Sequence, residues 1–224
     1  MAGGAGGCPE PNRPAKDVRK TVHQPSTINH QLTPKTQKAA LRKQLRELAA
    51  GHSAAERAAA SEQICRRLRA QPFWTQARAV LAFVPMPVEP DIGPLLTEAL
   101  AAGKRLALPR YDAGRDCYWA HEVKDPLREM GPGYYGIIEP LPTCALFNLK
   151  ELDLILVPGL GFGPDGRRLG RGKGYYDKIL AQTSGWKCGL AFDWQLVPGI
   201  PMEGHDVFLN CILTPSRVEP GVHP

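Results

Sequence analysis

Residues 152–183 read LDLILVPGLGFGPDGRRLGRGKGYYDKILAQT, and this stretch decides the expected fold. Its first six residues, 152–157, are apolar apart from one aspartate, which is typical of a strand covered on both faces of a sheet. A glycine-rich loop follows, and residues 176–183 are predicted to form a short helix. A buried strand, a loop and a helix in this order predict an α/β protein.

The same alternation continues on both sides of this stretch. Strands are predicted at 79–84, 105–109, 117–123, 189–192 and 211–214, and helices at 34 to about 50, 53 to about 69 and 92–102. We therefore predict one three-layer α/β/α domain with a mostly parallel, Rossmann-like sheet. In such sheets, ligands bind beyond the carboxyl ends of the strands.

The two N-terminal helices have recognisable start and stop signals. Thr33 can cap the first helix, and Gly51 can end it. Ser53 and Glu56 match the capping box that starts a second helix. Two helices are therefore expected before the first strand.

The two ends of the chain differ from its body. Residues 1–37 are poor in apolar residues and rich in glycine and proline, so a disordered tail is predicted there. Their five basic and two acidic side chains give the tail +3, half of the net charge of +6. An organelle-targeting leader is an alternative, although the tail has little amphipathic pattern. The domain is expected at 38–216, with a short C-terminal tail at 217–224.

The composition argues against several functional classes. No run of about 18 apolar residues is present, so no membrane-spanning helix is expected. Only 7% of the residues are aromatic and the predicted strands carry Val, Leu and Ile, which disfavours an RNA-binding sheet. The six cysteines include no C-x-x-C pair, so no zinc knuckle or dithiol redox site is indicated. We expect a monomer in the reducing cytoplasm, without membrane or nucleic-acid partners.

The loop after the central strand carries the candidate chemistry. Seven glycines between 159 and 174 let backbone N–H groups approach a ligand. Arg167, Arg168, Arg171 and Lys173 add four positive charges. Clustered backbone donors with Arg and Lys suit a polyphosphate. A mobile, solvated loop and a Gly/Arg-rich RNA-binding segment are the alternatives.

Two familiar nucleotide motifs fail in this loop. GFGPDG at 161–166 matches G-x-G-x-x-G, but its proline and aspartate predict a turn where a helix should open. Gly172-Lys173 is followed by glycine instead of the Ser or Thr of a P-loop, so no hydroxyl is available for Mg²⁺. A metal would need a carboxylate, and Asp177 is the nearest candidate.

The run GLGFGPDGRRLGRGKGYYD at 159–177 resembles the signature of the 5-formyltetrahydrofolate cyclo-ligases, also called 5,10-methenyltetrahydrofolate synthetases. The resemblance extends from Lys38 to Thr214 and includes GIIEP at 136–140. It implies an enzyme that converts 5-formyltetrahydrofolate and ATP to 5,10-methenyltetrahydrofolate, ADP and phosphate with Mg²⁺. ATP phosphorylates the formyl oxygen and N10 closes the ring, which needs positioning and charge neutralisation more than a covalent nucleophile.

The resemblance also implies a set of functional residues. The nucleotide contacts that it implies are Lys38, Arg42, Arg168, Leu169, Gly170, Arg171, Gly172, Lys173, Gly174, Tyr175 and Tyr176. The implied folate contacts are Val84, Glu89, Arg171, Gly172, Lys173, Gly174 and Tyr175, and the implied Mg²⁺ ligands are Asp177 and Asp206. Among these residues, Arg171 and Lys173 are expected to stabilise the transferred phosphoryl group.

Each of these residues also has a simpler interpretation. Lys38 and Arg42 could form a solvated basic face, and Tyr176 could be a core aromatic. Asp177 could cap a helix, and Asp206 could end a turn.

Two questions stay open at the level of sequence. Glu89 and Asp91 both follow the first strand, and either carboxylate could pair with the amino-pyrimidine of a pterin. Phe83 and Tyr135 could stack on the pterin or belong to the core. A catalytically silent folate-binding protein and an RNA-binding accessory protein are the alternative functions.

Overall fold

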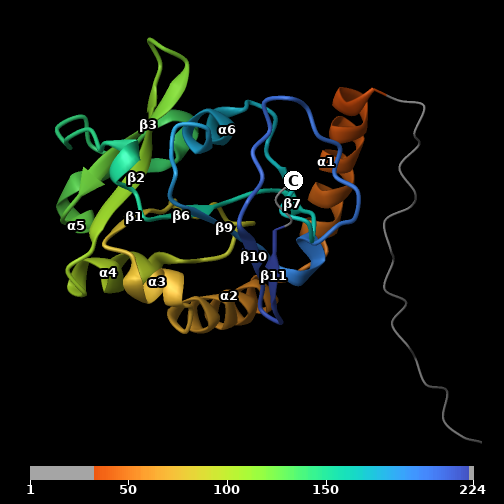
Figure 1. Cartoon of the computed structure of the whole chain (residues 1–224), viewed down its shortest axis with the longest axis horizontal. Helices are drawn as coiled ribbons and strands as arrows, with labels where there is room; N and C mark the ends of the chain where they lie inside the picture. The colour runs from red at the N-terminus through yellow and green to blue at the C-terminus, as the bar shows by residue number, and fades with distance from the viewer. Residues whose placement is uncertain (1–32, 222–224) are drawn as a thin grey trace, which may run out of the picture.

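The computed structural model describes residues 33–221, and its centre is a seven-stranded sheet of order β11-β10-β9-β6-β1-β2-β3 (Figure 1). The seven strands are β1 (Ala79–Leu81), β2 (Arg105–Asp112), β3 (Cys117–Val123), β6 (Leu154–Val157), β9 (Trp186–Leu190), β10 (Cys211–Leu213) and β11 (Val218–Pro220). The five strands from β10 to β2 pair in parallel, whereas β3 and β11 are antiparallel edges. The predicted α/β fold with a mostly parallel sheet is confirmed.

Helices cover both faces of the sheet. One face carries α2 (Ala54–Arg69), α3 (Pro72–Gln76) and α4 (Gly93–Ala101), and the opposite face carries α6 (Tyr175–Leu180) (Figure 1). Leu68 of α2 shares one core cluster with Val80 of β1. Ile179 of α6 shares the other cluster with Leu81, because successive strand residues face opposite sides of the sheet. Both clusters are buried, as the apolar strands predict.

The first helix, α1 (Pro34–Ala50), stands at the end of the sheet instead of covering a face (Figure 1). Its buried Leu41 and Leu45 pack in a separate cluster with Leu160 and Leu169. These partners flank and form the small hairpin of β7 (Gly161–Phe162) and β8 (Arg168–Leu169). The helix therefore supports the glycine-rich segment.

The predicted helix caps are confirmed. The Thr33 hydroxyl accepts from the Thr36 N–H at 3.4 Å, and Gly51 is the C-cap of α1. At the start of α2, the Glu56 N–H donates to the Ser53 hydroxyl at 3.2 Å. The Ser53 N–H in turn donates to the Glu56 carboxylate at 2.8 Å, which completes the capping box.

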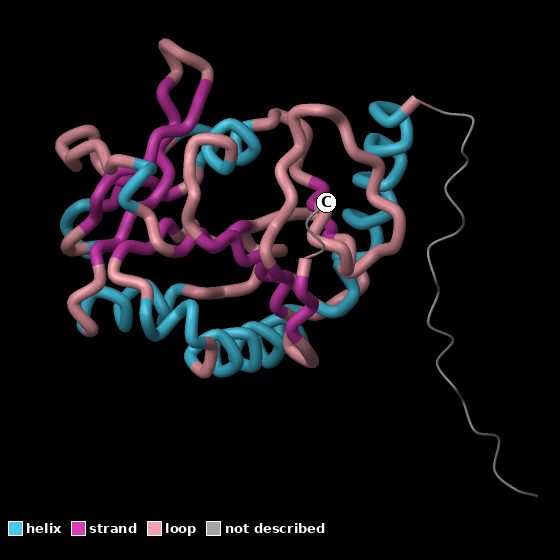
Figure 2. The backbone as a smooth tube through the Cα atoms, in the orientation of Figure 1, coloured by secondary structure: helices cyan, strands magenta, loops and turns pink. Residues whose placement is uncertain are grey.

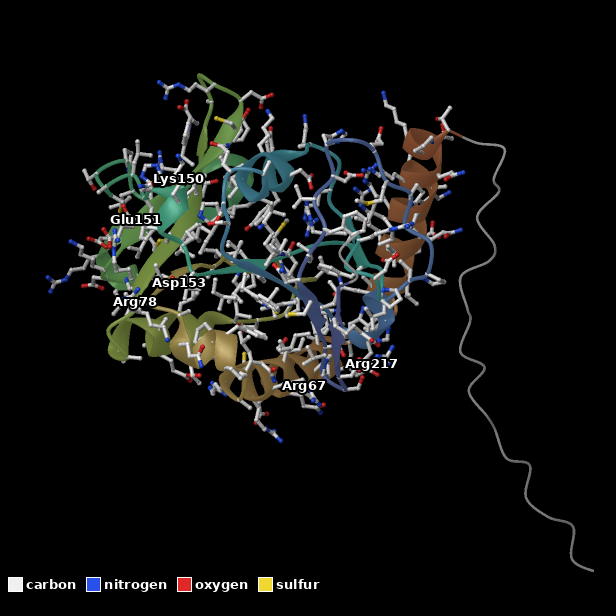
Figure 3. The ribbon with its side chains drawn as sticks, viewed as in Figure 1. Arg67, Arg78, Lys150, Glu151, Asp153 and Arg217 are labelled. Atoms are coloured by element: carbon white, nitrogen blue, oxygen red, sulfur yellow. The ribbon has the colours of Figure 1, made fainter. Side chains whose placement is uncertain are left out.

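Asp153 shows why β6 begins at Leu154, two residues later than predicted. Its carboxylate accepts from the backbone N–H groups of Arg78 and Ala79, at 2.8 and 2.9 Å (Figure 3). Its own N–H donates to the Ala79 carbonyl at 3.0 Å. The one polar residue of the predicted strand therefore ties β6 to the start of β1.

The expected domain boundaries differ from the structure at both ends. Residues 34–37 form the first turn of α1, because the Thr33 cap starts the helix there. Residues 218–220 form β11, which pairs with β10 after a turn that carries Arg217 (Figure 3). Arg67 of α2 holds this turn by donating to the Pro215 carbonyl at 2.9 Å. The rest of the two predicted tails, residues 1–32 and 222–224, lies outside the described residues.

The remaining elements are short. They are α5 (Pro126–Glu129), the hairpin of β4 (Met130–Pro132) and β5 (Ile138–Pro140), and the 3₁₀ turns Tyr134–Gly136, Leu149–Glu151 and Asp193–Gln195. β9 begins at Trp186, three residues before the predicted start. Over residues 33–221, no helix is both long and apolar enough to cross a membrane.

Candidate active site

A pocket of about 450 Å³ opens beyond the carboxyl ends of β1 and β6. Its lining includes Val84 after β1 and Gly159 after β6, which is where a parallel sheet is expected to bind ligands. Figure 2 shows that long loops run through the space between α6 and α1. The pocket is lined by every implied contact residue: Lys38, Arg42, Val84, Glu89, Arg168, Leu169, Gly170, Arg171, Gly172, Lys173, Gly174, Tyr175, Tyr176, Asp177 and Asp206.

The loop at 170–174 needs glycine at specific positions. Gly172 has φ +106° and Gly174 has φ +67°, and side chains with a Cβ rarely adopt such conformations. A Cβ on Gly170 would lie 3.0 Å from an Arg168 guanidinium nitrogen. The glycines therefore permit this tight loop against the arginine. The helix that follows, α6, has only six residues.

Lys38 bridges two carboxylates from a distant loop. Its side chain is 5% exposed, and its Nζ donates to Glu203 Oε2 at 2.8 Å and to Asp206 Oδ2 at 2.5 Å. The Lys38 hydrogen bond lowers the pKa of Glu203 below its ordinary value. The interpretation of Lys38 as part of a solvated face is therefore wrong.

Arg42 anchors the glycine loop. Its Nε donates to the Gly170 carbonyl at 3.0 Å, and Leu169 next to it is buried under α1. Burial, followed by the charge of Arg46, lowers the pKa of Arg42. Because the side chain of Leu169 packs in the apolar cluster, only its backbone can serve a ligand.

Arg168 and Asp177 form a second ion pair at 2.7 Å, with side chains 5% and 15% exposed. Arg168 also donates to the Pro158 carbonyl at 3.3 Å, and its guanidinium lies 5.6 Å from the centre of the Tyr176 ring. Tyr176 packs against both core clusters, and burial raises the pKa of its hydroxyl. The predicted core role of Tyr176 is compatible with its place at the pocket wall.

Glu89, and not Asp91, lines the pocket after β1. Its Oε1 accepts from Arg171 Nη2 at 2.8 Å, and its Oε2 accepts from the Met86 N–H at 3.0 Å. Asp91 instead accepts from the Gly93 N–H at 2.9 Å, at the start of α4. Of the two candidates left open by the sequence, only Glu89 lines the pocket.

Comparison with known proteins identifies the family of this chain. A sequence model of the 5-formyltetrahydrofolate cyclo-ligase family matches residues 34–215. The chain belongs to this family. The Escherichia coli K12 protein named 5-formyltetrahydrofolate cyclo-ligase is 32% identical over 164 residues, which cover 70% of this chain and 88% of that protein. The mouse protein of the same name is 28% identical over 200 residues, covering 81% and 95% of the two chains.

Solved structures support the same fold. The NMR structure of Aquifex aeolicus 5,10-methenyltetrahydrofolate synthetase is 31% identical, has a TM-score of 0.74, and covers 84% of this chain and 93% of its own. The synthetase structure from Mycoplasma pneumoniae is 21% identical with a TM-score of 0.64, covering 80% and 98%, and shows the shared fold alone. The cyclo-ligase fold therefore extends over most of this chain.

The donor set that the cyclo-ligase resemblance implies for Mg²⁺ consists of Asp177 and Asp206. Both line the pocket, and carboxylate oxygens are the hard donors that this ion prefers. The part of the chain that the structure describes holds no cluster of three His, Cys, Asp or Glu suited to a metal. Two carboxylates are still compatible, because Mg²⁺ is commonly held by one or two of them together with waters and substrate phosphates. His205 lies 3.7 Å from Asp206, beside this pair.

Sequence reasoning missed four polar residues of the pocket: Lys35, Tyr118, Glu139 and Glu203. Glu139 is 2% exposed, and its Oε1 is buried without a hydrogen-bond partner within residues 33–221. The GIIEP run contained Glu139, but no spacing rule assigned it a role. Phe83, for which the sequence left a pterin contact and a core role open, lines the pocket and also belongs to a core cluster. The side chain of Tyr135 lies outside the described residues.

Proposed function

We propose that this protein is an ATP- and Mg²⁺-dependent ligase that converts 5-formyltetrahydrofolate to 5,10-methenyltetrahydrofolate, ADP and phosphate. The observation that carries the proposal is a single pocket in which two cation–carboxylate pairs flank a glycine-rich loop. These pairs are Lys38 with Asp206 and Arg168 with Asp177. Cations for phosphate oxygens and carboxylates for a divalent ion are thereby present together.

In the proposed reaction, the residues of the glycine-rich loop and those of the pocket wall have different roles. The formyl oxygen takes the γ-phosphoryl group of ATP, N10 attacks the formyl carbon, N10 loses its proton, and phosphate departs with that oxygen. Arg171 and Lys173 would stabilise the charge on the transferred group. Mg²⁺, held by Asp177 and Asp206, would neutralise part of the phosphate charge.

The remaining nucleotide contacts would come from the surrounding elements. Lys38 and Arg42 on α1 would reach the phosphates, while Glu89 and Val84 after β1 would face the folate. Since Glu89 already holds Arg171, binding of the folate and alignment of the catalytic arginine are expected to be linked.

The assay is formation of the methenyl product, followed by its absorbance, with purified protein, 5-formyltetrahydrofolate, ATP and Mg²⁺. Asp177→Asn should remove most turnover. Asp165→Asn is the matched control, because Asp165 lies in the same segment, pairs with Arg167 and does not line the pocket. A folded wild-type sample without product formation would contradict the proposal. Folate binding without ATP turnover would instead favour the silent folate-binding alternative.

The proposed partners are small molecules, namely ATP and 5-formyltetrahydrofolate. The proposed enzyme is a monomer in the cytoplasm. An RNA-binding function predicts strong, salt-dependent RNA affinity. Absence of such affinity in the full chain, measured at low salt, supports the enzymatic function over that alternative.

A further inference from the structure

The tip of the β2–β3 hairpin is bonded to the first residue of α6. Asp116 Oδ1 accepts from the Tyr175 hydroxyl at 2.7 Å and from the Tyr111 hydroxyl at 2.6 Å. Asp116 and Tyr175 are separated by 59 residues in the chain. The bond therefore joins the hairpin to the end of the glycine-rich loop.

Asp116 has an unusual backbone conformation. Its φ is +46°, which makes it the one non-glycine residue with positive φ within residues 33–221. This region is unfavourable for residues with a Cβ, although aspartate tolerates it better than most. Strained residues persist where neighbouring contacts hold them, and they gather at functional sites. Here the two hydroxyl hydrogen bonds are such contacts.

The ring of Tyr175 is also held by aromatic neighbours. It lies edge-on to Tyr111 and Tyr118, with ring centres 5.7 and 5.1 Å apart. Tyr118 and Tyr175 both line the pocket, whereas Asp116 does not. Because Tyr175 directly follows Gly174, the glycine loop offers little restraint of its own.

We propose that Asp116 is a positioning residue that holds the Tyr175 ring in the orientation that the folate meets. The inference rests on the proposed function, because the family resemblance implies that Tyr175 contacts the folate as well as the nucleotide. Asp116 acts through Tyr175 and touches neither substrate. The phosphates of ATP are assigned to Lys38, Arg42 and the loop cations, which lie on other elements. Loss of the Asp116 bond should therefore weaken folate use more than ATP use.

Steady-state kinetics with each substrate varied in turn test this assignment. Asp116→Ala removes the acceptor of both hydroxyls. Loss of the Tyr175 bond should raise the KM for 5-formyltetrahydrofolate about fivefold, with the KM for ATP within about twofold of wild type. Tyr175→Phe removes the hydroxyl that donates to Asp116 and leaves the Tyr111–Asp116 bond in place, so it should raise the folate KM by a similar factor. The double variant should be no worse than Asp116→Ala, because that variant already lacks the Asp116–Tyr175 bond.

Three further variants separate the hydrogen bond from other causes. Asp116→Asn keeps an acceptor and tolerates positive φ, so it should restore most of the lost folate affinity. Asp116→Gly relieves the backbone strain without supplying a carboxylate, and it should behave like the alanine variant. Arg115→Ala changes the exposed neighbour at the same hairpin tip and should leave both KM values unchanged.

Hydrogen exchange of the backbone amides at 170–178 in the unliganded protein gives a readout that needs no turnover. Exchange should be faster in Asp116→Ala and Tyr175→Phe than in wild type, and unchanged in Arg115→Ala. Any of three results would overturn the proposal. The first is a wild-type folate KM with wild-type exchange in both Asp116→Ala and Tyr175→Phe. The others are additive effects in the double variant and an equal rise of both KM values. A wild-type protein that makes no product would contradict the proposed function instead, and the exchange rates would still decide the role of Asp116.

Discussion

The ion pair with Glu89 holds the Arg171 guanidinium in place before any ligand binds. The side chain of Arg171 is 37% exposed, while the side chain of its partner Glu89 is only 6% exposed. The second oxygen of Glu89 is fixed by the Met86 N–H. A cation held in this way loses little side-chain freedom on binding, which favours stabilisation of charge that develops during a reaction.

Replacing Arg171 tests this role. Arg171→Ala should lower kcat/KM by a factor of about 100 or more, because a preorganised donor to the developing charge is lost. Arg167→Ala is the control in the same loop, since Arg167 donates to the Ile200 carbonyl and lies outside the pocket lining. Its turnover should stay within about twofold of wild type. Near-normal kinetics of the Arg171 variant would remove this residue from the catalytic set.

The thiol of Cys65 gives a prediction about reactivity. Burial raises the pKa of Cys65 to about 11, and the side chain is 3% exposed on the inner face of α2. The reactive thiolate form should therefore be scarce at pH 8. Iodoacetamide labelling of the native protein, followed by peptide mass spectrometry, should leave Cys65 largely unmodified at pH 8. Modification at the rate of a free cysteine would contradict the burial of this side chain.

At the scale of the elements, features set by local sequence signals are predicted better than features set by pairing with distant segments. The apolar run at 154–157 forms β6, and the caps at Thr33 and Ser53 begin α1 and α2 as expected. β11 was missed because its pairing with β10 depends on the fold and not on its own three residues. The place of α1 at the end of the sheet was also missed, since an apolar stripe shows that a helix packs but not on what.

The capping box of α2 can be measured directly. Ser53→Ala should lower the free energy of unfolding by about 1 kcal/mol, because the Glu56 N–H loses its acceptor. Glu56→Gln is the matched control, as glutamine serves equally in a capping box, and it should be close to neutral. An unchanged free energy of unfolding in Ser53→Ala, measured by denaturant unfolding, would contradict the capping role of Ser53.

At the scale of the whole molecule, the pocket is built from chain segments that are far apart in the sequence, from Lys35 on α1 to Asp206. The sequence could indicate the loop at 168–177 and the residues implied by family resemblance, because these form local patterns. It could not indicate Glu203 or Tyr118, which become neighbours of the loop only through the strand order of the sheet. The same holds for the buried Glu139, whose surroundings are set by tertiary packing alone.

Ligand binding should stabilise the whole domain. ATP with Mg²⁺ at about 100 times its Kd should add about 2.7 kcal/mol to the free energy of unfolding. For a chain of this size, that amounts to a rise of about 5–10 °C in Tm. Chelation with EDTA should remove most of this shift, and Asp177→Asn should not show it, whereas Asp165→Asn should. A shift that is insensitive to EDTA would exclude Mg²⁺ from the binding step.

Transfer of labelled oxygen is the most direct measurement of the proposed chemistry. 5-Formyltetrahydrofolate carrying ¹⁸O in its formyl group is incubated with the protein, ATP and Mg²⁺, and the phosphate is analysed by mass spectrometry. If the pocket phosphorylates the formyl oxygen, methenyl product and phosphate should form in equal amounts, with one ¹⁸O in each phosphate. Product formed with unlabelled phosphate, or no product from the folded protein, would contradict the assigned reaction.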